Sequence, residues 1–127
     1  MRLQLALNVR DLDEAVAFYS RLFSSEPAKR RPGYANFAID EPPLKLILFE
    51  SPEADERLNH LGVEVFSDAD VDSAGDRFAA AGLPVLVEDD TFCCHARQKK
   101  VWTREPQGLR WEWYRVLDDD ALRKRPM

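Results

Sequence analysis

The chain has 127 residues, of which 45% are hydrophobic and 32% are charged, and its formal net charge at pH 7 is −5. This length and composition are typical of one globular domain and exclude a disordered protein. The negative charge, without a concentrated basic stripe, argues against nucleic acid as a partner. The apolar runs are too short to span a membrane.

The first half of the chain predicts a strand, a helix and three further strands. Alternating residues in Gln4–Val9 predict the first strand. Asp11, followed three positions later by Glu14, is similar to a capping box and predicts the start of a helix, which ends before Pro27. Turn signals at 31–33 and 41–43 separate three short strands, which are predicted at residues 26–29, 34–39 and 44–49.

The second half predicts the same order of elements. A strand from about Leu58 to Phe66 precedes a helix that opens near Asp68 or Asp70 and ends at Gly82, a residue suited to a left-handed C-cap. Three strands are predicted at residues 84–88, 100–103 and 109–116. The repeated order indicates internal duplication. We expect a single domain at residues 1–117, with modules at about 1–50 and 57–117, followed by a polar tail at 118–127.

The first strands of the two modules share one pattern of polar and apolar residues. Gln4 and His60 begin it, and alternation places each of them on the polar face of its strand. When the last strands of the modules are aligned, Glu112 falls opposite Leu46. This alignment leaves roughly ten extra residues in the second module, around residues 91–96, where we expect a loop that carries specific chemistry.

The only two cysteines, Cys93 and Cys94, are adjacent and lie in this extra segment. Adjacent cysteines cannot form the spaced disulfides of small secreted domains, and a bond between them would strain the backbone. Reduced thiols are the simpler interpretation. The chain also starts directly with a strand pattern instead of a secretory leader, so we expect a cytoplasmic protein.

These patterns resemble the vicinal oxygen chelate superfamily of glyoxalases and extradiol dioxygenases along nearly the whole chain. The resemblance implies an α+β fold in which two βαβββ modules form a curved mixed sheet with a metal cleft and helices on the outer face. It implies metal ligands at Gln4, His60 and Glu112. Leu46 cannot bind a metal, which favours an oxygen-activating enzyme over a four-ligand isomerase.

A closer resemblance is to the ArsI-type organoarsenical carbon–arsenic lyases and the related cadmium-induced CadI proteins. The segments that carry it are Leu3–Val9, Lys29–Ile39, Leu58–Val65, the Cys93–Cys94 pair, Lys100–Trp102 and Arg110–Tyr114. It implies an Fe(II)-dependent, dioxygen-consuming lyase that releases arsenite from small trivalent organoarsenicals such as methylarsenite or reduced aromatic arsenicals. Such a lyase would act in arsenic detoxification, as a monomer or a homodimer, with the arsenic held by Cys93 and Cys94.

The chemistry of these residue types agrees with that function. One imidazole, one carboxylate and one amide oxygen leave about three positions of six-coordinate Fe(II) for dioxygen and substrate. Trivalent arsenic prefers sulfur, and both sulfurs of adjacent cysteines can reach one arsenic only from a loop or a bulge. The groups expected to favour thiolate are His95, Arg97, Lys99 and Lys100. The polar residues expected on the ligand face are Asn8, Glu64, Arg110 and Tyr114.

Each candidate also has a structural interpretation. Gln4 and Glu112 can be solvent-exposed strand residues, His60 can be a hydrogen-bonded structural histidine, and the cysteines can be buried and inert. Trp111 and Trp113 are expected in the core on the opposite face from Glu112. The alternative functions are a non-catalytic cadmium- or arsenite-binding protein, or another enzyme of the superfamily such as a glyoxalase or a thiol transferase.

Overall fold

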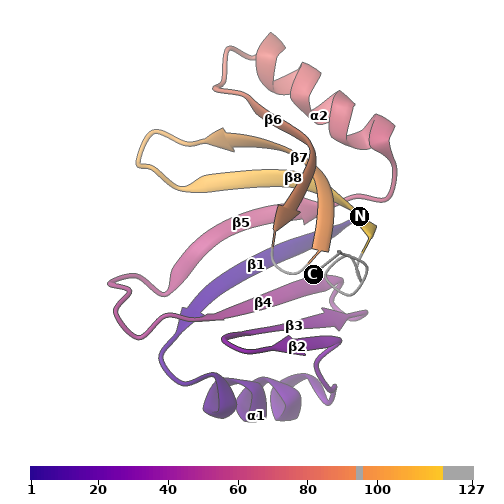
Figure 1. The fold of residues 1–127 in the computed structure, drawn as a ribbon. Coiled ribbons are helices and arrows are strands. Elements are labelled where there is room, and N and C mark those ends of the chain that lie inside the picture. The colour runs from indigo at the N-terminus through magenta and orange to yellow at the C-terminus, as the bar shows by residue number, and fades with distance from the viewer. Residues whose placement is uncertain (94–95, 119–127) are drawn as a thin grey trace, which may run out of the picture. The chain divides into compact units, whose positions relative to one another are not determined.

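The computed structural model describes residues 1–93 and 96–118. The elements follow the order β1, α1, β2, β3, β4 and then β5, α2, β6, β7, β8, so the βαβββ order occurs twice (Figure 1). This confirms the predicted α+β class. The chain forms two compact units, an N-terminal unit at Arg2–Leu61 and a C-terminal unit from Gly62 onward, which also includes Met1. Each unit is described by itself.

The N-terminal unit is a small mixed sheet with one helix. Its strands are β1 (Arg2–Val9), β2 (Lys29–Arg31), β3 (Tyr34–Ile39) and β4 (Leu44–Glu50), in the order β2-β3-β4-β1. β1 runs parallel to β4, whereas the other two pairs are antiparallel. The first residues of β5 (Leu58–Glu64) belong to this unit, and just before them the Arg57 carbonyl accepts a 2.6 Å hydrogen bond from the Asn8 amide.

Helix α1 (Leu12–Phe23) begins where its capping residues predict. The Asp11 carboxylate accepts a hydrogen bond from the Glu14 amide at 3.0 Å, and the Glu50 carboxylate accepts another from the Leu12 amide at 2.8 Å. Both bonds satisfy donors that the first helical turn leaves without partners. Ser24, in the left-handed region at φ 50°, ends the helix.

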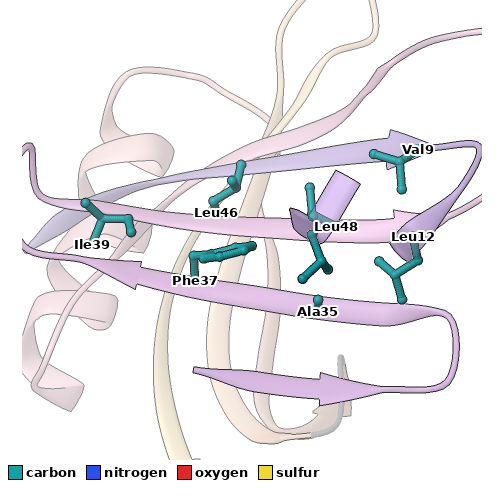
Figure 2. Close-up of a cluster of buried hydrophobic side chains, with 8 residues drawn as sticks. Val9, Leu12, Ala35, Phe37, Ile39, Leu46 and Leu48 are labelled. Carbon is teal, nitrogen blue, oxygen red and sulfur yellow. The ribbon is translucent and has the colours of Figure 1, made fainter. Parts of the chain in front are cut away.

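The core of the N-terminal unit lies between α1 and one face of the sheet. Figure 2 shows its side chains, which come from β1, β3, β4 and the start of α1. The buried members are Val9, Leu12, Val16, Ala35, Phe37, Ile39, Leu46 and Leu48. Burial of a large apolar side chain contributes about 1.5–3 kcal/mol, so this cluster anchors the sheet. By alternation, the residues between these core positions share the opposite face, here called the Gln4 face, with Gln4 on β1 and Lys45 beside it on β4.

The C-terminal unit pairs an antiparallel sheet with the second helix. Its strands β6 (Leu86–Cys93), β7 (Ala96–Arg104) and β8 (Arg110–Asp118) have the order β8-β7-β6. Helix α2 (Asp68–Ala80) packs on β7 and β8 around Val65, Val71, Ala74, Phe78 and Val101.

The predictions for Trp113 and Gly82 hold in this unit, whereas that for Trp111 holds only in part. The Trp113 ring packs against the core, with its centroid 5.3 Å from that of Phe78. Trp111 is half-buried, and its ring centroid lies 6.2 Å from that of Trp113. Gly82, after the end of α2, has φ +74°, a conformation that favours glycine. Ser67 caps the start of α2, because its hydroxyl accepts a hydrogen bond from the Asp70 amide at 3.2 Å.

The predicted loop at residues 91–96 is wrong as far as the structure describes it. β6 continues through Cys93, and β7 begins at Ala96, so the extra residues of the second module lengthen a hairpin. Ion pairs stabilise the polar stretch that obscured these strands in the sequence. Arg97 lies 2.9 Å from Asp90, and Lys99 contacts two aspartates at 3.1 and 3.5 Å. The hydrogen bond with Asp72 raises the pKa of Lys99 above its usual value.

Two other predictions also need correction. β2 lies at residues 29–31 instead of 26–29, because the turn at Gly33, with φ +73°, pairs Arg31 directly with Tyr34. The alignment of Glu112 with Leu46 is wrong, because only Leu46 lies on the face of its sheet that packs against a helix. Leu46 packs in the core under α1, whereas Glu112 alternates with the core residue Trp113 and faces away from α2. The residues of β4 that face away from α1 are Lys45, Ile47 and Phe49, and none of them has a carboxylate.

The ends of two other strands differ by a few residues from their predicted positions. β5 stops at Glu64, and β8 extends to Asp118, the first residue of the predicted tail. Residues 119–127 lie outside the described part of the chain. Within the described part, neither helix has both the length and the apolar character that crossing a membrane requires.

Candidate metal site

Gln4 is buried on the Gln4 face of β1. Its exposed fraction is 2%, and its amide oxygen Oε1 has no hydrogen-bond partner among the described residues. The interpretation of Gln4 as a solvent-exposed amide is therefore wrong. A buried amide oxygen without a partner costs about 1–3 kcal/mol of stability. A ligand that accepts its lone pair would offset that cost.

His60 is buried in β5, with an exposed fraction of 5%. Its Nδ1 lies 2.8 Å from the side-chain oxygen of Asn59, and the Asn59 amide nitrogen donates to Asn8 Oδ1 at 3.1 Å. Asn8 in turn donates to the Glu56 carbonyl at 3.0 Å. These bonds orient the imidazole ring from its Nδ1 side.

Glu112 is buried on β8, in the C-terminal unit. One of its carboxylate oxygens lies 3.0 Å from Lys100 Nζ, and both side chains are 2% exposed. The register explains the contact. Glu112 pairs with Trp102, and Lys100 lies two residues before Trp102 on β7, so Lys100 is a diagonal neighbour of Glu112 on the same face. The solvent-exposed interpretation of Glu112 is therefore wrong. We call this face of β6–β8 the Glu112 face.

Lys100 is a buried neighbour of Glu112 that the sequence alone does not identify. Its ammonium compensates the charge of Glu112 and lies 5.2 Å from the centre of the Trp102 ring. An effect of Lys100 on the cysteine thiols stays a prediction, because the cysteine side chains lie outside the described part of the chain. Arg97 and Lys99 also form ion pairs with aspartates. The spacing of two residues between Gln98, Lys100 and Trp102 was the available signal, because such spacing places all three on one face of a strand.

The donor types at the three predicted positions fit Fe(II) or a similar divalent ion. An imidazole nitrogen, an amide oxygen and a carboxylate are all ligands for such ions. The unpartnered Gln4 oxygen is the structural observation that favours a ligand on the Gln4 face. Among the described residues, no three His, Cys, Asp or Glu side chains gather in one group that could hold a metal. The predicted set contains only one histidine and one carboxylate, so the amide of Gln4 is essential to it.

The cysteine pair is only partly within the described residues. Cys93 is the last residue of β6 and pairs with Ala96, whereas Cys94 and His95 lie outside the described part of the chain. The strand path from Ala96 to Trp102, the partner of Glu112, measures about 20 Å in extended geometry. β7 is strongly curved (Figure 1), so the straight-line separation is shorter than this path.

The other polar residues expected near the site differ in their surroundings. Glu64 and Tyr114 are buried, whereas Asn8 is half-buried and Arg110 is exposed. The Arg110 guanidinium lies 5.1 Å from the centre of the Trp102 ring. Asn8 belongs to the hydrogen-bond series that ends at His60.

A pocket of about 440 Å³ opens beside Trp102. Its lining residues are Pro84, Val85, Leu86, Glu88, Trp102, Thr103, Arg104 and Arg110. Leu86 of β6 pairs with Trp102 of β7, and Trp102 pairs with Glu112 of β8. Trp102, which lines the pocket, is therefore the cross-strand neighbour of the predicted ligand Glu112. The Trp102 indole donates to the Glu88 carboxylate at 2.6 Å, which fixes the ring at the pocket wall. A mainly apolar pocket with a few charged groups suits a small organic ligand.

The sequence model of the Glyoxalase/Bleomycin resistance protein/Dioxygenase superfamily matches residues 3–113. The chain belongs to this superfamily. It is 58% identical to the cadmium-induced protein CadI of Mycobacterium tuberculosis over 118 residues, which are 93% of this chain and 78% of CadI. It is 54% identical to a trivalent organoarsenical cleaving enzyme of Thermomonospora curvata over 125 residues, 97% of this chain and 83% of the enzyme.

Superfamily membership also agrees with a solved structure. The Mn(II)-bound glyoxalase from Novosphingobium aromaticivorans superposes with a TM-score of 0.65 at 26% identity, over 88% of this chain and 37% of the glyoxalase. The predicted fold family is therefore confirmed. The resemblance to CadI and to the organoarsenical lyases is likewise confirmed by the two curated relatives.

Proposed function

We propose that this superfamily member cleaves the carbon–arsenic bond of trivalent organoarsenicals and releases arsenite. The observation that carries the proposal is the burial of Gln4, His60 and Glu112 at the predicted ligand positions, with the Gln4 oxygen unpartnered. The 54% identity to a relative named as a trivalent organoarsenical cleaving enzyme supports the same reaction.

The metal of this proposal is Fe(II), held by Gln4 Oε1, His60 Nε2 and the Glu112 carboxylate. Fe(II) with three protein ligands supplies open positions and the redox chemistry that couples dioxygen to oxidation of the substrate. Lys100 holds the Glu112 carboxylate through its 3.0 Å contact, so the carboxylate keeps one orientation. For methylarsenite, one dioxygen oxidises the methyl carbon to formaldehyde while arsenic leaves as trivalent arsenite, which balances atoms and electrons.

Cys93 and Cys94 bind the arsenic in this proposal. Each thiolate replaces a hydroxyl group on arsenic, and the hydroxyl leaves as water with a proton. Two sulfur–arsenic bonds fix the substrate, so that positioning supplies much of the rate. The pairing between β6 and β7 is irregular between Glu88 and Thr91, within the hairpin that carries Cys93.

The pocket beside Trp102 is our candidate for the organic group of larger arsenicals. It is on the same face as Glu112 and offers apolar contacts from Leu86 and Pro84. An aromatic ring matches this lining, and Arg104 or Arg110 can pair with an acidic ring substituent. We further propose that the protein acts in the cytoplasm, where its thiols stay reduced, as a monomer or a homodimer.

Anaerobic loading with Fe(II), followed by methylarsenite and air, tests this function. We expect arsenite and consumed dioxygen in equal amounts, and no arsenite without Fe(II) or without dioxygen. A Glu112→Gln variant should lose turnover, whereas Glu105→Gln, a change in the turn before β8, should not. Intact methylarsenite after incubation with the loaded wild type would contradict the proposal.

The second candidate is a non-catalytic protein that sequesters cadmium or arsenite through its thiols. The 58% identity to a cadmium-induced protein favours it. The same experiment separates the two functions, because a binder retains the arsenical with its methyl group and consumes no dioxygen. A glyoxalase or a thiol transferase, the third alternative, should keep its activity when both cysteines are replaced by serine.

A further inference from the structure

Three hydrogen bonds in series connect a backbone carbonyl to the ring of His60. Asn8 Nδ2 lies 3.0 Å from the Glu56 carbonyl, Asn59 Nδ2 lies 3.1 Å from Asn8 Oδ1, and His60 Nδ1 lies 2.8 Å from Asn59 Oδ1. All of these residues belong to the N-terminal unit. The two asparagines come from different strands, since Asn8 is in β1 and Asn59 in β5.

The series allows only one direction of donation. A backbone carbonyl can only accept, so the group of Asn8 that faces Glu56 must be its NH2 and its oxygen must face Asn59. The Asn59 group that meets this oxygen must therefore be an NH2, which turns the Asn59 oxygen toward His60. An amide oxygen accepts and never donates, so His60 Nδ1 must carry a proton.

We propose that Asn8 and Asn59 are positioning residues that hold the proton of neutral His60 on Nδ1 and thereby present the Nε2 lone pair to the metal. The inference rests on the proposed function, because the metal that uses Nε2 belongs to it. A neutral imidazole in water exchanges between two tautomers, and only the one with a proton on Nδ1 can donate from Nε2 to a metal. The series removes this freedom before any metal arrives.

The anchor of the series is itself rigid. The Asn8 backbone amide donates to the Arg57 carbonyl at 2.6 Å, next to the Glu56 carbonyl that its side chain contacts. Backbone and side chain of Asn8 are thus bound to two successive carbonyls. This double attachment fixes the Asn8 amide plane, and through it the orientation of Asn59.

Long-range proton–nitrogen NMR of the metal-free protein tests the tautomer directly. The chain has two histidines, and a His60→Ala variant identifies the signals of His60. At a pH where the ring is neutral, we expect a protonated Nδ1 and an unprotonated Nε2. A wild-type spectrum with the proton on Nε2 would overturn the proposal.

Substitutions then test the role of the asparagines. Asn59→Leu should shift His60 toward a mixture of tautomers and weaken Mn(II) binding, measured by calorimetry, about 10–100-fold. Asn8→Leu should have a smaller effect of the same kind, because it releases the Asn59 amide without removing it. Asn59→Asp still offers an acceptor and should keep the wild-type tautomer. The matched control is Asn36→Leu, a buried asparagine that donates to the Tyr34 hydroxyl and is outside the series.

The readouts separate this inference from the proposed function. If Asn59→Leu and Asn8→Leu both keep the wild-type tautomer and Mn(II) affinity, the positioning role is wrong even if the enzyme cleaves methylarsenite. If the tautomer and affinity change as expected but the loaded wild type leaves methylarsenite intact, the positioning role stands and the proposed function fails. Should Asn59→Leu not fold, Asn8→Leu and Asn59→Asp supply the same comparison.

Discussion

Lys100 and Glu112 form an ion pair inside the C-terminal unit, with 3.0 Å between Nζ and the carboxylate and only 2% of either side chain exposed. Loss of one member leaves the other charge buried, which costs about 3–5 kcal/mol. We therefore expect Lys100→Met to lower the free energy of unfolding in urea by about that amount.

Lys99→Met is the matched control for this change. Its ion pairs with Asp72 and Asp89 involve aspartates that are 63% and 74% exposed, so solvent screens them and the loss of Lys99 should cost much less than the loss of Lys100. The double variant Lys100→Met with Glu112→Gln should recover part of the stability, because no charge then stays buried. An equal loss of unfolding free energy in the two lysine variants would show that the buried ion pair stabilises the protein no more than the exposed ones.

The unpartnered amide oxygen of Gln4 predicts opposite effects on stability and on metal binding. Gln4→Met keeps the length of the side chain and removes the orphan oxygen, so the free energy of unfolding should rise by about 1–3 kcal/mol. The same variant should bind Mn(II) at least about tenfold more weakly. Leu5→Met, which changes the other face of β1, should alter neither quantity by much. Unchanged Mn(II) affinity in Gln4→Met would remove Gln4 from the ligand set.

The pocket beside Trp102 predicts a change in substrate preference. Leu86→Trp fills the pocket, so KM for aromatic arsenicals should rise while KM for methylarsenite stays close to that of the wild type. Val87→Trp is the matched control, because Val87 is similarly exposed but pairs with the core residue Val101 on the opposite face. Steady-state kinetics with both substrates would show the difference. Equal increases in KM for both would indicate that the pocket does not select the organic group.

The cysteine pair should be needed for arsenic binding but not for metal binding. Replacement of Cys93 and Cys94 by serine removes the soft ligands, so we expect binding of methylarsenite, measured by equilibrium dialysis, to weaken by more than about tenfold. Mn(II) affinity should stay within about twofold of the wild type, because serine changes none of the proposed metal ligands. Retained arsenical binding in the double variant would place the arsenic elsewhere.

Most of the fold was predictable because its signals are local. The cap at Asp11, the turn at Gly33 and the glycine after α2 each act within a few residues, and all three have the predicted role. The hairpin of β6 and β7 was not predictable from periodicity. Its polar residues are stabilised by partners on other elements. Lys99 pairs with Asp72 of α2, which is distant in the sequence, and Arg97 pairs with Asp90 of β6.

The candidate ligands were likewise only partly predictable from the sequence. Alternation along a strand already placed Gln4, His60 and Glu112 on polar faces, because successive side chains point to opposite sides. Pairing between strands was needed to reveal Lys100 as the partner of Glu112 and to bring Asn8 of β1 to Asn59 of β5. Such contacts join residues distant in the chain, and a periodic pattern contains no information about which strands become neighbours. Local chemistry thus specified the elements and the candidate donors, and the assembled sheets specified what each donor touches.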